Sequence, residues 1–385
     1  MIQAPVGGSV EAGFEPVQEA FAANFEHHGE VGAACCIYVH GRRVVDLWGG
    51  VTKPGGTEPY TADTLQMVLS VSKGIVAIAA HMLAQEGRLD FDAPVVEYWP
   101  EFAAEGKEKI PVRWLFSHRA GLAAIDPPQL TVEDVYAWTP VVDALAAQRP
   151  WWEPGTAHGY HAGTYGWLAG EVIQRIAGMS VGRFIAERIA RPLQAEFFIG
   201  LPDGLDSRVA PILAPLPAPP GTPPDAVAVR LADPTTLAHK AFSNPGLLGA
   251  INEPRFRAAE VPAANGIGTA RALAAIYSAC IGQVDGVRLL DARTLDHATR
   301  TQSHGEDLVM AYETHYGTGF QLPFPFRPMA GQGSFGHYGM GGSVAFAHPA
   351  HGYSFAYTMN QMLPSARVDP RPAALVQALT RCLRQ

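Results

Sequence analysis

The sequence predicts a mixed protein in which strands from both ends of the chain form one antiparallel sheet, flanked by helices, and a mainly helical lobe is inserted between them. Two observations predict this. Residues 31–51 and 334–362 both carry strand-like runs of apolar and small side chains. The stretch between them contains several segments with apolar residues at helical spacing. We therefore expect an α/β lobe formed by residues 1–88 and 285–385, and an all-α lobe formed by residues 89–284.

The first elements lead to a buried central helix. Residues 31–51 (VGAACCIYVHGRRVVDLWGGV) read as a β-hairpin, because two strand-like runs flank the turn sequence HGRR. Residues 68–87 (VLSVSKGIVAIAAHMLAQEG) then repeat apolar side chains at helical spacing, and Gly87 favours the end of a helix. This helix is apolar nearly all round, which predicts that it lies in the middle of the molecule.

The later elements are mostly helices until the closing strands. We expect a helix that begins near Thr164, a second over about 181–193, a third over 269–283, and an amphipathic helix, PAALVQALTRCL, near the end of the chain. Residues 202–262 are rich in proline and read as a long irregular segment. Because such segments in compact proteins are usually functional or disordered, we expect an ordered flap beside a binding site.

Composition and charge exclude several classes of function. The formal net charge of −8 and the pI near 5.9 argue against nucleic acid or an anionic membrane as partner, and favour a small, weakly charged or uncharged ligand. We expect neither a signal peptide nor a membrane span. The four cysteines form no CxxC pair, which predicts neither a zinc site nor a disulfide framework and favours the cytoplasm. The sequence indicates no oligomeric state.

The strongest chemical feature is a serine followed three positions later by one of only five lysines. Ser70 and Lys73 form the one S-x-x-K sequence of the chain, at the head of the expected central helix. Residues three apart share a helix face, so Lys73 can reach the Ser70 hydroxyl. The Ser70 backbone N–H, unpaired at a helix start, can donate to an oxyanion. Burial should lower the pKa of Lys73, which would let it take part in proton transfer from a nucleophilic serine.

A purely structural interpretation of the same residues is a helix start, with Ser70 or Ser72 as the cap and Lys73 as an exposed residue of the first turn. Two facts oppose it. A lysine in the first turn is unfavourable against the helix dipole, and the helix is apolar on every side. Ser72 is the poorer nucleophile candidate, because no lysine follows it by three positions.

Five stretches carry a family resemblance. Through these stretches and their order, the chain resembles the serine β-lactamase-related esterases, the family VIII carboxylesterases. The fold of that family is that of class C β-lactamases and DD-peptidases. The resemblance covers about residues 30–362 and implies a carboxylesterase that works through an acyl-enzyme on Ser70, with no metal or other cofactor. The stretches are SVSKG, LFSHRAGL, PGTAHGYHAGTYGWLAGEVI, NGIGTARALA and FGHYGMGGSVAFAHP.

The resemblance also implies roles for further residues. Tyr160, in GYHAG, takes the place of the family's tyrosine and would accept the Ser70 proton, then pass it to the leaving alcohol. A phenol is a poor base unless its anion is stabilised, so we expect the Lys73 ammonium to lower the pKa of Tyr160. The alternative is a loop tyrosine that packs on the adjacent helix.

The third motif of the family corresponds to His337-Tyr338-Gly339, where β-lactamases have Lys-Thr-Gly. Small Gly339 lets a substrate approach the strand backbone. The Met340 N–H would be the second oxyanion donor beside the Ser70 N–H. His337 is expected to bond towards Tyr160 or the substrate, or else to be an ordinary satisfied strand histidine.

Two departures from β-lactamases bear on the substrate. The asparagine that they carry two residues after the tyrosine is Ala162 here, and their Lys-Thr is replaced by His337-Tyr338. These missing groups bind the amide and carboxylate of β-lactams, so we expect an uncharged ester as substrate. We expect the pocket to be lined by residues 202–262 and by Tyr338 and Trp152.

Other functions stay open at this point. The same Ser70, Lys73 and Tyr160 could transfer an acyl group to an alcohol or amine, act as a weak β-lactamase or DD-peptidase, or belong to a non-catalytic binding protein of this fold. An α/β-hydrolase is disfavoured because G-x-S-x-G is absent. A metal enzyme is disfavoured because the fourteen histidines, His158 and His161 included, form no HExxH sequence.

Overall fold

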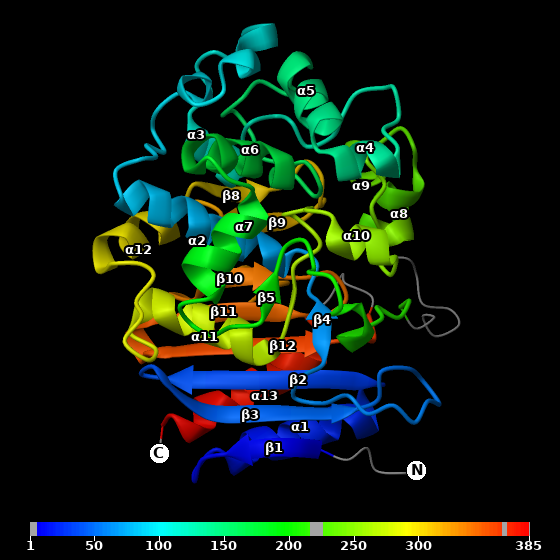
Figure 1. Cartoon of the computed structure of the whole chain (residues 1–385), viewed down its shortest axis with the longest axis vertical. Coiled ribbons are helices and arrows are strands. Elements are labelled where there is room, and N and C mark those ends of the chain that lie inside the picture. The colour runs from blue at the N-terminus through cyan, green and yellow to red at the C-terminus, as the bar shows by residue number, and fades with distance from the viewer. Residues whose placement is uncertain (1–5, 216–225, 364–367, 385) are drawn as a thin grey trace.

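The computed structural model describes residues 6–215, 226–363 and 368–384. Its main sheet has the strand order β1-β3-β2-β12-β11-β10, and every neighbouring pair is antiparallel. The strands in this order are β1 (Val6–Val10), β3 (Arg42–Gly50), β2 (Gly32–Val39), β12 (Tyr353–Met359), β11 (Val344–His348) and β10 (Phe335–Tyr338). Strands from the two ends of the chain therefore meet between β2 and β12 (Figure 1), which confirms the predicted sheet built from both termini.

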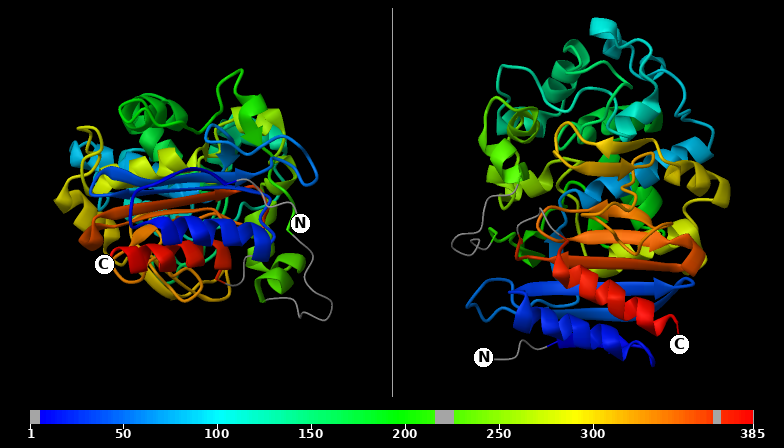
Figure 2. Two further views of the ribbon diagram at one scale, coloured as in Figure 1. Left: turned by 90° about the horizontal axis from the view of Figure 1, so that it is seen from below. Right: turned by 180° about the vertical axis from the view of Figure 1, so that it is seen from behind.

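Helices cover both faces of this sheet. On one face α1 (Glu15–His27) and α13 (Pro370–Cys382) lie side by side, as both views of Figure 2 show. On the other face α11 (Ala270–Ile281) packs against β2, β11 and β12. Adjacent Cys35 and Cys36 in β2 point to opposite faces, and both are completely buried because each face is covered. The main sheet is therefore covered by helices on both faces.

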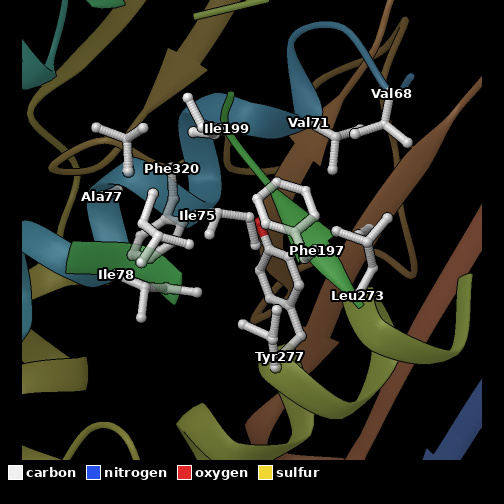
Figure 3. Close-up of a cluster of buried hydrophobic side chains, with 14 of the residues drawn as sticks. Val68, Val71, Ile75, Ala77, Ile78, Phe197, Ile199, Leu273, Tyr277 and Phe320 are labelled. Carbon is white, nitrogen blue, oxygen red and sulfur yellow. The ribbon is translucent and has the colours of Figure 1, made fainter. Parts of the chain in front are cut away.

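The central helix α2 (Val71–Gln85) lies between the sheet and the helical part, and all but its last two residues are buried. Figure 3 shows apolar side chains of α2 packed against Phe197 and Tyr277 from neighbouring elements. A side chain at Gly74 would collide there, since its Cβ would lie 2.1 Å from the Tyr277 hydroxyl. Burial on all sides explains why this helix lacks a polar face.

Several of the remaining helices lie above α2 in Figure 1. The helix expected near Thr164 is α6 (Tyr165–Ala177), which packs directly on α2. The others are α3 (Val112–Phe116), α4 (Val132–Ala137), α5 (Thr139–Ala147), α7 (Val181–Ile185) and α12 (Ala292–Thr299). A small sheet and a hairpin complete this part, with strands β4 (Leu65–Met67), β5 (Phe197–Phe198), β6 (Val209–Ala210), β7 (Ile267–Gly268), β8 (Ser303–Glu306) and β9 (Glu313–Tyr316).

The segment 202–262 is less irregular than the sequence predicts. It contains the short helices α8 (Ala226–Ala232), α9 (Leu237–Ser243) and α10 (Pro254–Ala258). Proline clustering hid them, although Thr236 caps α9 and Pro254 occupies the first turn of α10, positions where both residue types favour a helix. Most of the proline run, 216–225, lies outside the described residues.

Helix α11 packs on the sheet, although its residues were expected in the helical lobe. The lobe boundaries at residues 88 and 285 stay a prediction. No helix in the described part of the chain is long and apolar enough to cross a membrane.

Candidate active site

The turn before α2 presents Ser70 in a strained backbone. Leu69 has a φ of +49°, a left-handed conformation that is unusual for a leucine. The Ser72 hydroxyl donates to the Leu69 carbonyl oxygen at 2.5 Å and accepts the Gly266 N–H at 2.8 Å. Residue 266 must be glycine, because a Cβ there would lie 2.5 Å from the Ser72 oxygen. The two hydrogen bonds of Ser72 therefore stabilise the turn that carries Ser70. Gly266 belongs to the NGIG sequence.

Lys73 is completely buried and points at Ser70. Its Nζ lies 3.1 Å from the Ser70 Oγ and donates to the carbonyl oxygens of Ala162, at 2.8 Å, and Ala263, at 2.9 Å. Among the described residues no carboxylate pairs with it, so burial is uncompensated and lowers the pKa of Lys73 well below its usual range. A neutral amine in this position is a hydrogen-bond acceptor for the serine proton.

Tyr160 lies on the other side of the serine. Tyr160 and Ser70 line the same pocket, and the Tyr160 ring centroid is 4.9 Å from the Lys73 Nζ. Burial raises the pKa of the Tyr160 phenol, although the nearby Ser70 side chain acts in the opposite direction. The expectation that Lys73 would lower the pKa of Tyr160 is therefore wrong for this structure, because the buried lysine disfavours its own charged form.

The third motif brings β10 against the serine turn. A Cβ on Gly339 would lie 2.3 Å from the Val68 carbonyl oxygen, so only glycine allows this approach. Met340 follows on the same strand end, and both Met340 and Ser70 line one pocket. In the described chain neither residue's N–H donates to a backbone oxygen. The oxyanion role of these two N–H groups stays a prediction.

The other expected substrate contacts differ. Tyr338 lines the pocket, and its hydroxyl accepts the Met329 N–H at 3.0 Å. His337 does not line it: its side chain is buried behind Tyr160, with the Nδ1 2.7 Å from the Tyr338 carbonyl oxygen and the Nε2 without a partner among the described residues. Burial lowers the pKa of His337 to about 3, so the ring is neutral. Trp152 lies outside the lining as well and packs edge-on against His161.

The pocket beside Ser70 is open and has an empty volume of about 1000 Å³, its mouth included. One wall comes from the 226–251 region, as expected for the flap, and is apolar. Another part of the lining is rich in aromatic side chains. The flap wall comprises Val227, Leu231, Ala241, Phe242, Pro245, Leu247, Leu248 and Ile251, and the aromatic part includes Met310, Tyr312, Tyr316, Phe324 and Tyr338. Such a pocket suits an apolar group attached to the reacting carbonyl.

Sequence reasoning missed the residues that hold the Tyr160 loop. The N–H groups of three consecutive residues, Gly159, Tyr160 and His161, donate to the His118 carbonyl, the Asp307 carboxylate and the His118 ring. His118 belongs to LFSHRAGL, a stretch to which the sequence analysis assigned no role. No pattern around Asp307 (GEDLVM) indicates a role. Within residues 6–215, 226–363 and 368–384 no group of three or more His, Cys, Asp and Glu side chains is arranged to hold a metal ion.

A serine and a buried lysine one turn apart at the head of a central helix, between an antiparallel sheet and a helical part, define the class of serine β-lactamase-like enzymes. The Beta-lactamase family model matches residues 17–379, and the chain belongs to this family.

Its relatives confirm the resemblance to the esterase branch. The Esterase/beta-lactamase LipL of Mycobacterium tuberculosis is 34% identical over 366 residues, which are 93% of this chain and 83% of that protein. The crystal structure of a family VIII carboxylesterase is 37% identical, with a TM-score of 0.89, over 98% of this chain and 100% of that one. EstA from Arthrobacter nitroguajacolicus Rue61a is 32% identical, with a TM-score of 0.86, over 97% and 99% of the two chains.

Proposed function

We propose that the protein is a carboxylesterase that hydrolyses small, uncharged esters through an acyl-enzyme on Ser70. The observation that carries the proposal is the uncompensated burial of Lys73 with its Nζ 3.1 Å from the Ser70 Oγ. The names of the relatives support esters as the substrate class.

In the acylation step, the Ser70 oxygen attacks the ester carbonyl while its proton passes to the neutral Lys73 amine. The N–H groups of Ser70 and Met340 stabilise the oxyanion of the tetrahedral intermediate. The Tyr160 hydroxyl donates its proton to the leaving alcohol and regains one from Lys73, so the C–O bond breaks without releasing an alkoxide. With its pKa raised, the phenol is suited to this role as a neutral proton carrier.

Deacylation reverses the proton path. A water molecule takes the place of the alcohol, gives its proton to the Tyr160–Lys73 pair as it attacks the acyl carbon, and the proton returns to the Ser70 oxygen as the acid leaves. The lining of the pocket is mostly apolar, with Arg327 as its one charged side chain among the described residues, and it supports a neutral substrate. Ala162 and His337 stand where β-lactamases carry an asparagine and a lysine, and neither provides a group for the carboxylate of a β-lactam.

Acyl transfer to an alcohol is the second candidate, and the apolar flap wall is the observation that favours it, because this wall could hold an alcohol in place of water. β-Lactam hydrolysis and a non-catalytic binding role rank lower. The cytoplasm remains the proposed compartment, since all four cysteines are free thiols.

The test is a panel of 4-nitrophenyl esters of increasing acyl length, run beside nitrocefin. We expect rapid ester turnover, slow nitrocefin turnover, and an acyl adduct on Ser70 in intact-protein mass spectra. Ser70→Ala should remove turnover and the adduct while the circular dichroism spectrum stays unchanged. Nitrocefin turnover that rivals that of the esters would contradict the substrate class, and mainly transesterified product in excess alcohol would favour the transferase.

A further inference from the structure

The Tyr160 side chain sits on a loop that has no regular secondary structure of its own. Residues 157–161 belong neither to a helix nor to a strand. A loop of this kind cannot fix a phenol against Ser70 through its own backbone hydrogen bonds, so its N–H groups need acceptors from elsewhere in the chain. His118 supplies two of the three acceptors, and the N–H of Tyr160 itself donates to the Asp307 Oδ1 at 3.0 Å.

Asp307 is a completely buried carboxylate with an unusual set of partners. Its Oδ1 also accepts the N–H groups of Val309 and Met310, each at 2.9 Å, and its Oδ2 accepts the Thr314 hydroxyl at 3.0 Å. No lysine or arginine of the described residues pairs with it. His158 favours the charged form of this carboxyl group, and the direct contacts that hold it are hydrogen bonds. Removing the carboxylate would leave three buried N–H groups without an acceptor.

These bonds join two parts of the site that are far apart in sequence. Val309, Met310 and Thr314 belong to the β8–β9 hairpin, and Met310 and Thr314 line the pocket. The bond to Tyr160 crosses 147 positions of the chain. The Asp307 Oδ1 atom thus holds both the β8–β9 loop, part of which lines the pocket, and the backbone of Tyr160.

We propose that Asp307 is a positioning residue that acts on catalysis through Tyr160, by fixing the distance of the phenol from Ser70. This inference rests on the proposed function of the Tyr160 hydroxyl. The competing interpretation is that Asp307 only closes its own turn, since two of its three N–H bonds are local.

The decisive experiment is a double-mutant cycle between Asp307 and Tyr160, read as kcat and KM for 4-nitrophenyl butyrate. Asp307→Ala should lower kcat about 100-fold, the typical effect of a misplacement of about 1 Å, with a smaller change in KM. In the Tyr160→Phe background the same change should have little further effect on kcat. Additive losses in kcat would overturn the proposal.

Two further variants separate positioning from folding. Asp307→Asn keeps an oxygen that can accept the three N–H bonds, so it should recover most of the kcat lost in Asp307→Ala, and the cycle can be run with it if the alanine variant does not fold. Asp291 is the matched control: it caps α12 by accepting the Thr294 N–H at 2.7 Å, at a place outside the pocket lining. Asp291→Ala should lower the melting temperature and leave kcat unchanged.

A second readout keeps this proposal separate from the esterase proposal. The rate at which a fluorophosphonate probe labels Ser70 depends on both proton transfers, from Ser70 to Lys73 and from Tyr160 to the departing fluoride, but needs no ester substrate. If the wild-type protein is labelled but cleaves no ester, the proposed substrate is wrong, and Asp307→Ala should still be labelled about 100 times more slowly. Labelling of Asp307→Ala at the wild-type rate would overturn the role of Asp307, and so would a wild-type protein that is neither labelled nor active.

Discussion

Lys73 and Arg371 are both completely buried cations in the first turn of a helix, yet their surroundings are opposite. The Arg371 guanidinium contacts two carboxylates, Glu30 at 3.1 Å and Asp369 at 2.8 Å, and also donates to the Gly341 carbonyl oxygen at 2.7 Å. Lys73 contacts a hydroxyl and two carbonyl oxygens and no carboxylate of the described residues.

This difference decides what each cation can do. Burial alone would lower the pKa of Arg371, but Glu30 and Asp369 raise it, so the guanidinium keeps its charge and ties the N-terminal part of the chain to α13. At Lys73 nothing opposes desolvation, and the pKa falls. A compensated buried charge is a structural device, whereas an uncompensated one yields a neutral amine that can accept a proton at ordinary pH.

The largest effect that tests this comparison is on catalysis. Lys73→Met, which keeps an apolar chain of similar length, should lower kcat for a 4-nitrophenyl ester about 10³- to 10⁴-fold, because the Ser70 proton loses its acceptor. The free energy of unfolding should change by about 1 kcal/mol or less, since the lost hydrogen bonds and the relieved desolvation oppose each other. Steady-state kinetics and urea denaturation measure the two quantities.

Lys107 provides a matched control. It is also buried and donates to two carbonyl oxygens, of Ala104 at 2.7 Å and of Gln148 at 2.5 Å, but it contacts no serine. Lys107→Met should therefore leave kcat within about twofold of wild type. A comparable loss of kcat in both variants would show that burying a lysine, rather than its contact with Ser70, is what the enzyme needs.

The second effect is on stability and concerns the other cation. Arg371→Met leaves Glu30 and Asp369 without their partner and should lower the free energy of unfolding by about 3–5 kcal/mol. The exposed pair Arg255–Glu133, with side chains 69% and 60% exposed, gives the comparison. Arg255→Met should cost about 1 kcal/mol or less. Equal losses in the two urea titrations would contradict the structural role of the buried network.

The two cations also show how far the sequence can be interpreted. Both stand where a positive charge opposes the helix dipole, which is the feature that singled out Lys73. Arg371 has the same feature but a structural role. That role depends on its contact with Glu30, which lies 341 positions away in the sequence. The apolar surroundings of Lys73 could be recognised from α2 alone, and the carboxylates around Arg371 could not.

The other parts of the site divide in the same way, into features that local sequence predicts and features that depend on contacts between distant residues. The sheet, the central helix and the approach of Gly339 follow from local patterns and family motifs. Asp307 could not be predicted, because its role arises from a contact between two loops. His337 and Trp152 were expected in the pocket, but a motif gives the position of a residue and not the direction of its side chain. The inward turn of His337 follows from its bond to the Tyr338 carbonyl oxygen.

The smallest expected effect is on the pH dependence of the free energy of unfolding. The pKa of Lys73 is lowered in the folded protein, so between that pKa and about 10.5 the unfolded chain holds one proton that the native state lacks. Stability from this group therefore rises with pH across that window, by about 1.4 kcal/mol per pH unit, and is lost as the pH falls. Lys73→Met should reduce the slope of unfolding free energy against pH by this amount between pH 8 and 9. Arg255→Met should leave the slope unchanged there, because an exposed arginine is protonated in both states. An unchanged slope in Lys73→Met would mean that the buried amine keeps its proton.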